Sequence, residues 1–196
     1  MTPLARWPLA LILVLAAGPA WALPPPLGIG GFFGGMLHPL FAPAHVLALL
    51  GLGLLTGQQT GWSRAVVLVA IAALAAGLGV MTMGFVPALM SEALLVLAGV
   101  AGLFAALARP LPEAAGGVLA AATGLAIALD SPPDVISVRE ANVMLIGTGL
   151  GASIVLIVAV TASSRLSGGW PRIAARILGA WIAASAILVL ALRFAR

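Results

Sequence analysis

Six apolar segments, each close to the length that a lipid bilayer requires, constrain this chain more than any other feature. They cover residues 37–57, 65–84, 87–108, 113–129, 138–163 and 172–194. About 20 mostly apolar residues let a helix cross a bilayer, and a backbone in lipid must satisfy its own hydrogen bonds, as a helix does. The composition agrees, because 7% of the residues are charged whereas a soluble domain has roughly 25%. The sequence predicts an all-α, polytopic membrane protein, with a six-helix transmembrane domain over residues 37–196.

The N-terminal residues 1–22 have the form of a secretory signal peptide. Arg6 supplies the basic region, residues 8–17 form an apolar run, and Ala20 and Ala22 flank Trp21 in an A-x-A cleavage motif. We expect cleavage after Ala22, and the alternative is an uncleaved anchor helix. Residues 23–36 are rich in proline and glycine, which disfavour a regular helix. They are expected to form an extracytoplasmic lead-in or a re-entrant plug.

The arginines predict the orientation of the bundle. With the signal peptide removed, the mature N-terminus lies outside, and the first, third and fifth connections face the cytoplasm. Those connections and their flanks carry five arginines: Arg64, Arg109, Arg165, Arg172 and Arg176. The outer side keeps three: Arg139, Arg193 and Arg196. This excess follows the positive-inside rule and predicts a multi-pass protein of the bacterial inner membrane, with the bilayer as its first partner.

Several function classes are excluded by composition and motif. The chain has no cysteine, so it has neither disulfides nor thiolate metal sites. Its nine arginines are scattered rather than clustered, which argues against a nucleic-acid-binding surface. It has neither a phosphate-binding glycine loop nor the nucleophile and zinc motifs of soluble hydrolases. We therefore expect no enzyme and no tightly bound cofactor.

The densest polar chemistry lies in residues 38–45, which contain both histidines of the chain, His38 and His45. In a straight helix these positions share a face but lie about 10 Å apart along the axis, too far for one metal with ligands about 2 Å away. Pro39 and Pro43 lie between them, and each removes a helical hydrogen bond, so a bend could bring the imidazoles together. Two alternatives stay open. Each histidine marks a separate station on a pathway, or both are neutral and bonded to carbonyls freed by the prolines.

Two acidic residues extend the candidate site. Glu92 lies near the start of the third segment, where an unpaired carboxylate is costly. It is read as a ligand or proton carrier facing the interior, and the alternative is a capping acid near the outer interface. Asp130 and Asp134 flank two prolines after the fourth segment. By themselves they are typical turn residues.

Residues 38–45 (HPLFAPAH) resemble the H-P-x-x-G-x-D-H motif of the HupE/UreJ family of hydrogenase and urease accessory membrane proteins. The motif's glycine is Ala42 here and its aspartate is Ala44. Residues 123–132 (TGLAIALDSP) resemble the family's second motif, H-G-x-A-H-G-x-E-x-P, with Thr123 and Ile127 in place of the two histidines. The resemblance covers essentially the whole mature chain.

This resemblance implies a permease for Ni(II) or Co(II) that serves urease or hydrogenase maturation. It assigns His38, His45, Glu92 and Asp130 as metal-binding residues, with Pro39, Pro43 and Thr123 along the pathway. The loss of the motif's aspartate and two histidines motivates an alternative, a membrane scaffold of the same fold that no longer transports metal. A transporter for another small substrate is the third possibility. The oligomeric state does not follow from the sequence.

Overall fold

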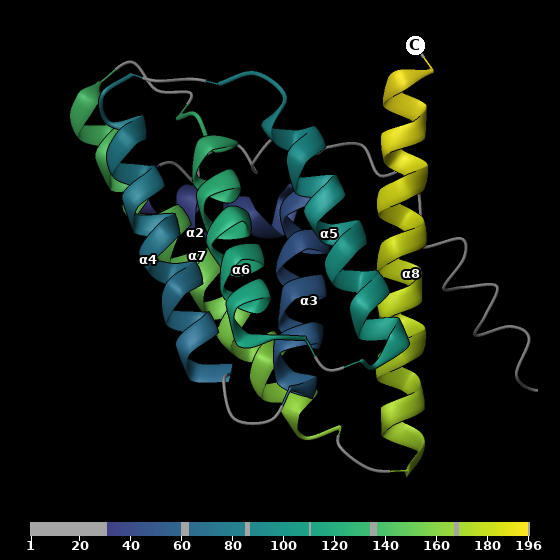
Figure 1. The fold of residues 1–196 in the computed structure, drawn as a ribbon. Helices are drawn as coiled ribbons and strands as arrows, with labels where there is room; N and C mark the ends of the chain where they lie inside the picture. The colour runs from purple at the N-terminus through teal and green to yellow at the C-terminus, as the bar shows by residue number, and fades with distance from the viewer. Residues whose placement is uncertain are drawn as a thin grey trace, which may run out of the picture.

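A computed structural model describes residues 31–59, 63–84, 87–109, 111–133, 137–166 and 169–195. Every regular element in these ranges is a helix, so the predicted all-α class is confirmed. The helices are, in order, α2 (Gly31–Phe41), α3 (Pro43–Gln58), α4 (Ser63–Met81), α5 (Met90–Leu107), α6 (Glu113–Leu129), α7 (Val138–Ser164) and α8 (Gly169–Phe194). From α3 onward, successive helices run in opposite directions (Figure 1). The signal peptide expected over residues 1–22 lies outside the described residues.

Helix length and hydropathy support part of the predicted membrane topology. Four of the described helices, α4, α5, α7 and α8, are long and apolar enough to cross a membrane. α2 and α3 meet this condition together, as a pair bent by 71°. α6 is apolar but has 17 residues, slightly fewer than the roughly 20 of a typical span. The described residues therefore contain four candidate spans, or five with the bent pair counted as one, and the sixth span at residues 113–129 stays a prediction.

The beginning of the bundle differs from the expectation for residues 23–36. The described part of this stretch is helical from Gly31 onward, so the prediction that no regular helix forms here is wrong for residues 31–36. The three consecutive prolines, at positions 24–26, precede the helix. The glycines within it are tolerated because they allow α2 to pack closely on α7, where a Cβ on Gly35 would collide with the carbonyl group of Met144.

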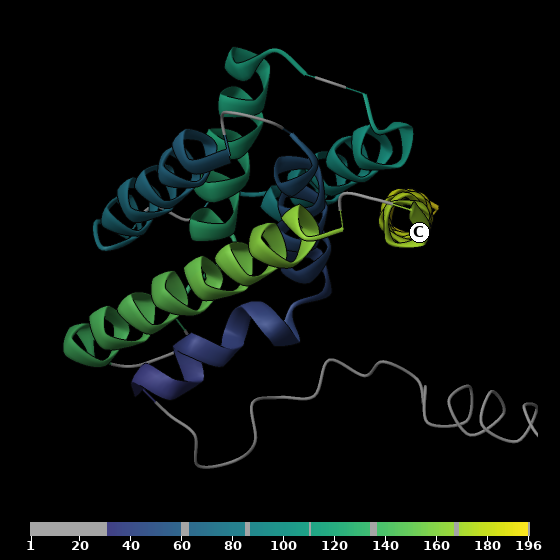
Figure 2. The same ribbon diagram turned by 90° about the horizontal axis from the view of Figure 1, so that it is seen from below.

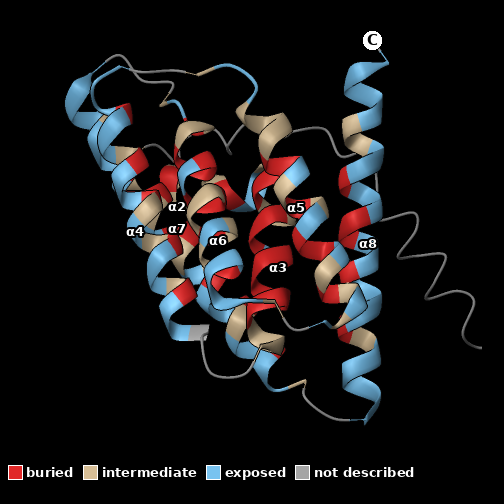
Figure 3. Cartoon of the chain, in the orientation of Figure 1, coloured by how far each residue is buried: buried red, intermediate tan, exposed pale blue. Residues whose placement is uncertain are grey.

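α3 forms the core of the bundle, and the other helices pack around it in pairs. α4 packs on α6, α5 on α8 and α2 on α7, while α3 contacts α5 and α7 closely (Figure 2). Ten of the 16 residues of α3 are buried, so this helix has little surface left for lipid (Figure 3).

Small residues let the helix backbones approach each other, as they do in membrane proteins generally. A Cβ on Gly147 would collide with the carbonyl oxygen of Phe32, and one on Gly151 with that of Met36, so these two glycines form the α7 side of the contact with α2. Gly102 and Gly179 play the same part between α5 and α8, where a Cβ on Gly102 would lie 2.7 Å from the carbonyl oxygen of Gly179. The bundle therefore closes by backbone contact at defined glycines.

The charged residues are divided between the two ends of the bundle. Arg64 lies in the first turn of α4, Arg109 and Arg165 follow α5 and α7, and Arg172 and Arg176 lie near the start of α8. Because the helices alternate in direction, all these positions lie at one end (Figure 1). The opposite end holds the α2–α3 break together with Glu92, Asp130 and Arg193.

The α2–α7 contact predicts a sharp difference between two glycine substitutions. Gly151→Ala should lower the free energy of unfolding by about 1–3 kcal/mol, because the new methyl group overpacks the contact with Met36. Gly117→Ala in α6 is the matched control, since a Cβ there meets nothing within 4 Å, and it should raise helix stability by up to about 1 kcal/mol. Denaturant unfolding in detergent measures both. Equal stability of the Gly151 variant and the wild type would contradict the contact.

Candidate metal-binding site

The break between α2 and α3 brings the two histidines together. His38 lies in the last turn of α2 and His45 in the first turn of α3. Their ring centroids are 5.2 Å apart, with the ring planes at 76°, whereas a straight helix would separate the two positions by about 10 Å along its axis. The prediction that a bend near the prolines lets the imidazoles approach is therefore confirmed.

The two prolines explain where the chain bends. Pro39 is buried inside α2 and Pro43 is the first residue of α3, a position where the missing N–H is no loss. The backbone nitrogen of a proline carries no hydrogen and cannot donate. The carbonyl group of Gly35 therefore has no helical donor at Pro39, and the carbonyl group of Pro39 has none at Pro43. The backbone stays connected across the break, because the Ala42 amide donates to the His38 carbonyl at 3.1 Å. The turn is therefore tight, with one residue, Ala42, between the two helices.

A buried hydrogen bond fixes the ring of His45. Its Nε2 lies 3.0 Å from Oδ2 of Asp130, the residue that follows α6. The His45 side chain is fully buried, and that of Asp130 is 20% exposed. An ionised carboxylate accepts, so Nε2 carries the proton and donates. In the neutral imidazole this leaves Nδ1 unprotonated, with a lone pair free for a ligand.

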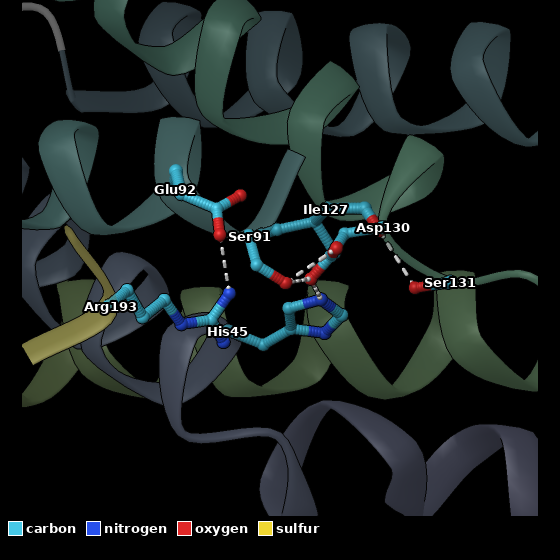
Figure 4. A network of polar contacts seen from close by, with 7 residues as sticks. All are labelled: His45, Ser91, Glu92, Ile127, Asp130, Ser131 and Arg193. Atoms are coloured by element: carbon cyan, nitrogen blue, oxygen red, sulfur yellow. Dashed lines mark hydrogen bonds and ion pairs between the residues drawn. The ribbon is translucent and has the colours of Figure 1, made fainter. Parts of the chain in front are cut away.

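Ser91 holds the other side of the Asp130 carboxylate. Its hydroxyl donates to the two oxygens at 2.8 and 3.0 Å, from the first turn of α5 (Figure 4). The adjacent Ser131 hydroxyl donates to the Ile127 carbonyl at 2.7 Å, which secures the end of α6. The chain His45–Asp130–Ser91 thus joins α3, α6 and α5 at the end of the bundle opposite the five arginines.

Two imidazole nitrogens at this site have no hydrogen-bond partner in the described part of the chain. They are Nε2 of His38 and Nδ1 of His45, and both atoms are buried. Buried polar atoms normally have partners, so each exception calls for an explanation such as an ion or a water molecule. Across the described ranges, no set of three or more His, Asp or Glu side chains is arranged to hold a metal ion. The site therefore offers two nitrogen ligands from neighbouring rings and lacks a third side-chain ligand.

The other residues expected at the site are placed differently. Oε1 of Glu92 accepts a hydrogen bond from Nη1 of Arg193 at 2.7 Å, so this acid pairs α5 with the end of α8 (Figure 4). Thr123 is fully buried in α6 and donates to the Leu119 carbonyl at 2.8 Å. Glu92 follows Ser91 directly, so the Arg193 pair lies beside the Asp130 network.

Two residues of the site, Ser91 and Arg193, are not predicted by the sequence. Ser91 stands next to Glu92, but its hydroxyl becomes informative only when α5 is known to lie beside the end of α6. Arg193 contributes to the predicted orientation, and its partner lies 101 residues earlier in the chain. Neither contact has a local sequence signal.

The hydrogen bonds of Asp130 predict that its substitution destabilises the protein more than substitution of an exposed acidic residue does. Asp130→Ala should lower the free energy of unfolding by about 1–3 kcal/mol, because it leaves the buried Nε2 of His45 and the Ser91 hydroxyl without an acceptor. Glu113→Gln, at the exposed start of α6, is the control and should leave stability within about 0.5 kcal/mol. Chemical unfolding in detergent measures the free energy of unfolding of both variants. Equal effects of the two substitutions would contradict the hydrogen-bond network around Asp130.

A comparison with known protein families identifies the family of the chain. The family model described as HupE / UreJ protein matches residues 11–189, which is nearly the whole chain. No curated protein and no solved structure matches significantly. A match of this length includes α2, α3 and α6, the helices that carry or adjoin His38, His45 and Asp130. The chain belongs to the HupE/UreJ family.

Proposed function

We propose that this protein is an inner-membrane permease for a divalent transition metal, Ni(II) or Co(II), which supplies urease or hydrogenase maturation. His38 and His45 are its first ligands for the ion. The observation that carries this proposal is the pair of buried, unpartnered ring nitrogens on imidazoles 5.2 Å apart. Membership of a family of hydrogenase and urease accessory proteins supports the same role.

The donor set suits these metals. Imidazole nitrogen binds Ni(II) and Co(II) well, and a histidine ligand usually donates its second ring N–H to a carboxylate that orients the ring and raises its basicity. Asp130 has this relation to His45 through the 3.0 Å contact at Nε2. Asp130 is therefore a positioning residue, which acts on the ion through His45 rather than as a direct ligand.

A site with two imidazole ligands binds a metal ion weakly, and a low affinity suits a transport pathway. Water molecules or the carbonyl oxygens at the proline break would complete the coordination shell. A pathway must bind an ion well enough to admit it and weakly enough to release it, so a site with fewer side-chain ligands than a structural metal centre fits transport rather than storage.

The positions of the arginines support entry of the ion from the outside. Five arginines lie at one end of the bundle, and the positive-inside rule assigns that end to the cytoplasm. The histidine site then lies near the outer end of the bundle. Six spans result when the bent α2–α3 pair counts as one and α6 as another, which places both ends of the mature chain outside.

One observation favours a second candidate, a scaffold of the same fold without transport. The position of one family histidine is occupied by Ile127, whose side chain is almost completely buried, and Ala44 replaces the aspartate beside His45. A scaffold would bind no nickel at neutral pH, so calorimetry on the purified protein separates the two functions.

Uptake measurements test the proposed function directly. Cells that express the wild type should accumulate nickel or cobalt with saturation, and His38→Ala or His45→Ala should lower the uptake rate at least about tenfold, since removal of even a supporting group at a metal site costs that much. Glu140→Gln, an exposed acid at the start of α7, is the control and should transport normally. Equal uptake by wild type and histidine variants would refute the site.

Restoring the family aspartate should strengthen the site. Ala44→Asp places a carboxylate beside His45, and calorimetry should give a Kd for Ni(II) about tenfold lower, equivalent to about 1.4 kcal/mol. Ala44→Asn adds a side chain of the same size without charge and should not reproduce the gain. Identical Kd values for Ala44→Asp and Ala44→Asn would show that this position does not face the ion.

A further inference from the structure

The seam between α3 and α6 continues inward from the histidine site, and any role for it in ion passage rests on the proposed transport function. The His45–Asp130 contact joins the two helices at the outer end of this seam. Leu52 is seven residues and Thr56 eleven residues after His45, which correspond to about two and three helical turns, and Thr123 is seven residues before Asp130. Leu52 and Thr56 therefore lie on the same face of α3 as His45, and Thr123 lies on the same face of α6 as Asp130.

The two threonines lie at successive depths along this seam. Thr123 is about 10 Å from Asp130 along α6, and Thr56 is about 16 Å from His45 along α3, from a rise of 1.5 Å per residue. α3 and α6 run in opposite directions (Figure 1), so both threonines lie inward of the His45–Asp130 contact. Each has a relative exposure of 1%.

The hydroxyl group of Thr56 is exceptional. Thr123 and Thr148, the two comparably buried helical threonines, donate to carbonyl groups four residues earlier, at 2.8 and 3.1 Å. The Thr56 hydroxyl is buried without a hydrogen-bond partner in the described residues. The amide group of Gln58, the last residue of α3, is also buried and unpartnered within that part of the chain. Such groups call for a ligand or a water molecule.

The packing of the seam differs from that of the other helix contacts. The contact of α3 with α6 is much less extensive than its contacts with α5 and α7. On the α7 side the backbones nearly touch, since a Cβ on Gly57 would lie 2.6 Å from the Val160 carbonyl oxygen. Leu52 and Ile127 are both buried, and their helical register places them on the facing sides of α3 and α6.

We propose that the α3–α6 seam is the route by which the metal ion crosses the protein. An ion that leaves His38 and His45 takes oxygen ligands from Thr123 and then from Thr56 on its way to the inner end of α3. The ligand is a divalent transition-metal ion that keeps part of its water shell. In the structure described, Leu52 and Ile127 close the route between the outer site and Thr56.

The test uses the purified full chain in vesicles that contain a fluorescent metal indicator, with Ni(II) or Co(II) added outside. Thr56→Val and Thr123→Val each replace a hydroxyl by a methyl group of similar size. Both should slow metal entry about tenfold, because each change removes an oxygen ligand from the ion where it has given up part of its water shell, and the barrier to passage rises. Thr148→Val is the matched control, a buried helical threonine on α7, and should transport like the wild type.

Two further measurements separate transport from folding. Calorimetry should give the same Kd for Ni(II) at the outer site in wild type, Thr56→Val and Thr123→Val, which shows that the fold and the histidines are intact. Thr56→Ser and Thr123→Ser keep the hydroxyl and should restore the wild-type rate. If one valine variant no longer binds Ni(II) at the outer site, the entry rate of the other valine variant tests the route.

Wild-type rates in both valine variants, with binding intact, would overturn the route while leaving the permease function in place. Slowing by Thr148→Val equal to that of the seam variants would also overturn it. An absence of saturable entry in the wild type itself would instead overturn the proposed function.

Discussion

The break between α2 and α3 is the constraint on which the rest of the site depends. Pro39 and Pro43 remove two helical hydrogen bonds, and the chain turns by 71° within one residue. The turn converts two histidines that a straight helix would hold about 10 Å apart along its axis into neighbouring rings. The turn is stabilised by the packing of α2 along α7, where glycines allow the two backbones to come into contact. Broken helices of this kind form ion sites in many transporters.

The hydrogen bonds from His45 to Asp130 and from Ser91 to Asp130 prepare the site at the break for a metal ion. They fix one imidazole in the tautomer whose free nitrogen can bind a metal, and they tie α3, α5 and α6 together beside the Glu92–Arg193 pair. The departures from the family motifs are consistent with this arrangement. Asp130 keeps the acidic position and supports His45, whereas Ala44, Thr123 and Ile127 supply no strong ligand. Both histidines of the first motif are present, and one of them, His45, is supported by Asp130.

Much of the fold followed from the sequence because lipid imposes simple rules on length and hydropathy. The segments predicted at 65–84, 87–108, 113–129 and 138–163 correspond to α4, α5, α6 and α7, with ends displaced by a few residues. The bend between the histidines followed from the prolines. The helix at 31–36 did not, because its stability comes from α7, more than 100 residues later in the chain. Contacts between helices, such as Ser91 with Asp130, depend on rotation and depth in the bundle, and periodicity within one helix specifies neither relative to its neighbour.

In the proposed site, a metal ion binds at the free Nδ1 of His45 and the free Nε2 of His38, and Asp130 supports His45 rather than binding the metal. Anomalous X-ray scattering from crystals of the protein soaked in Co(II) tests this most directly. We expect one anomalous peak about 2 Å from these two nitrogens, with the Asp130 oxygens still hydrogen-bonded to Nε2 of His45 and to Ser91. A peak bonded to the Asp130 carboxylate, or a peak remote from both imidazoles, would contradict the proposed site.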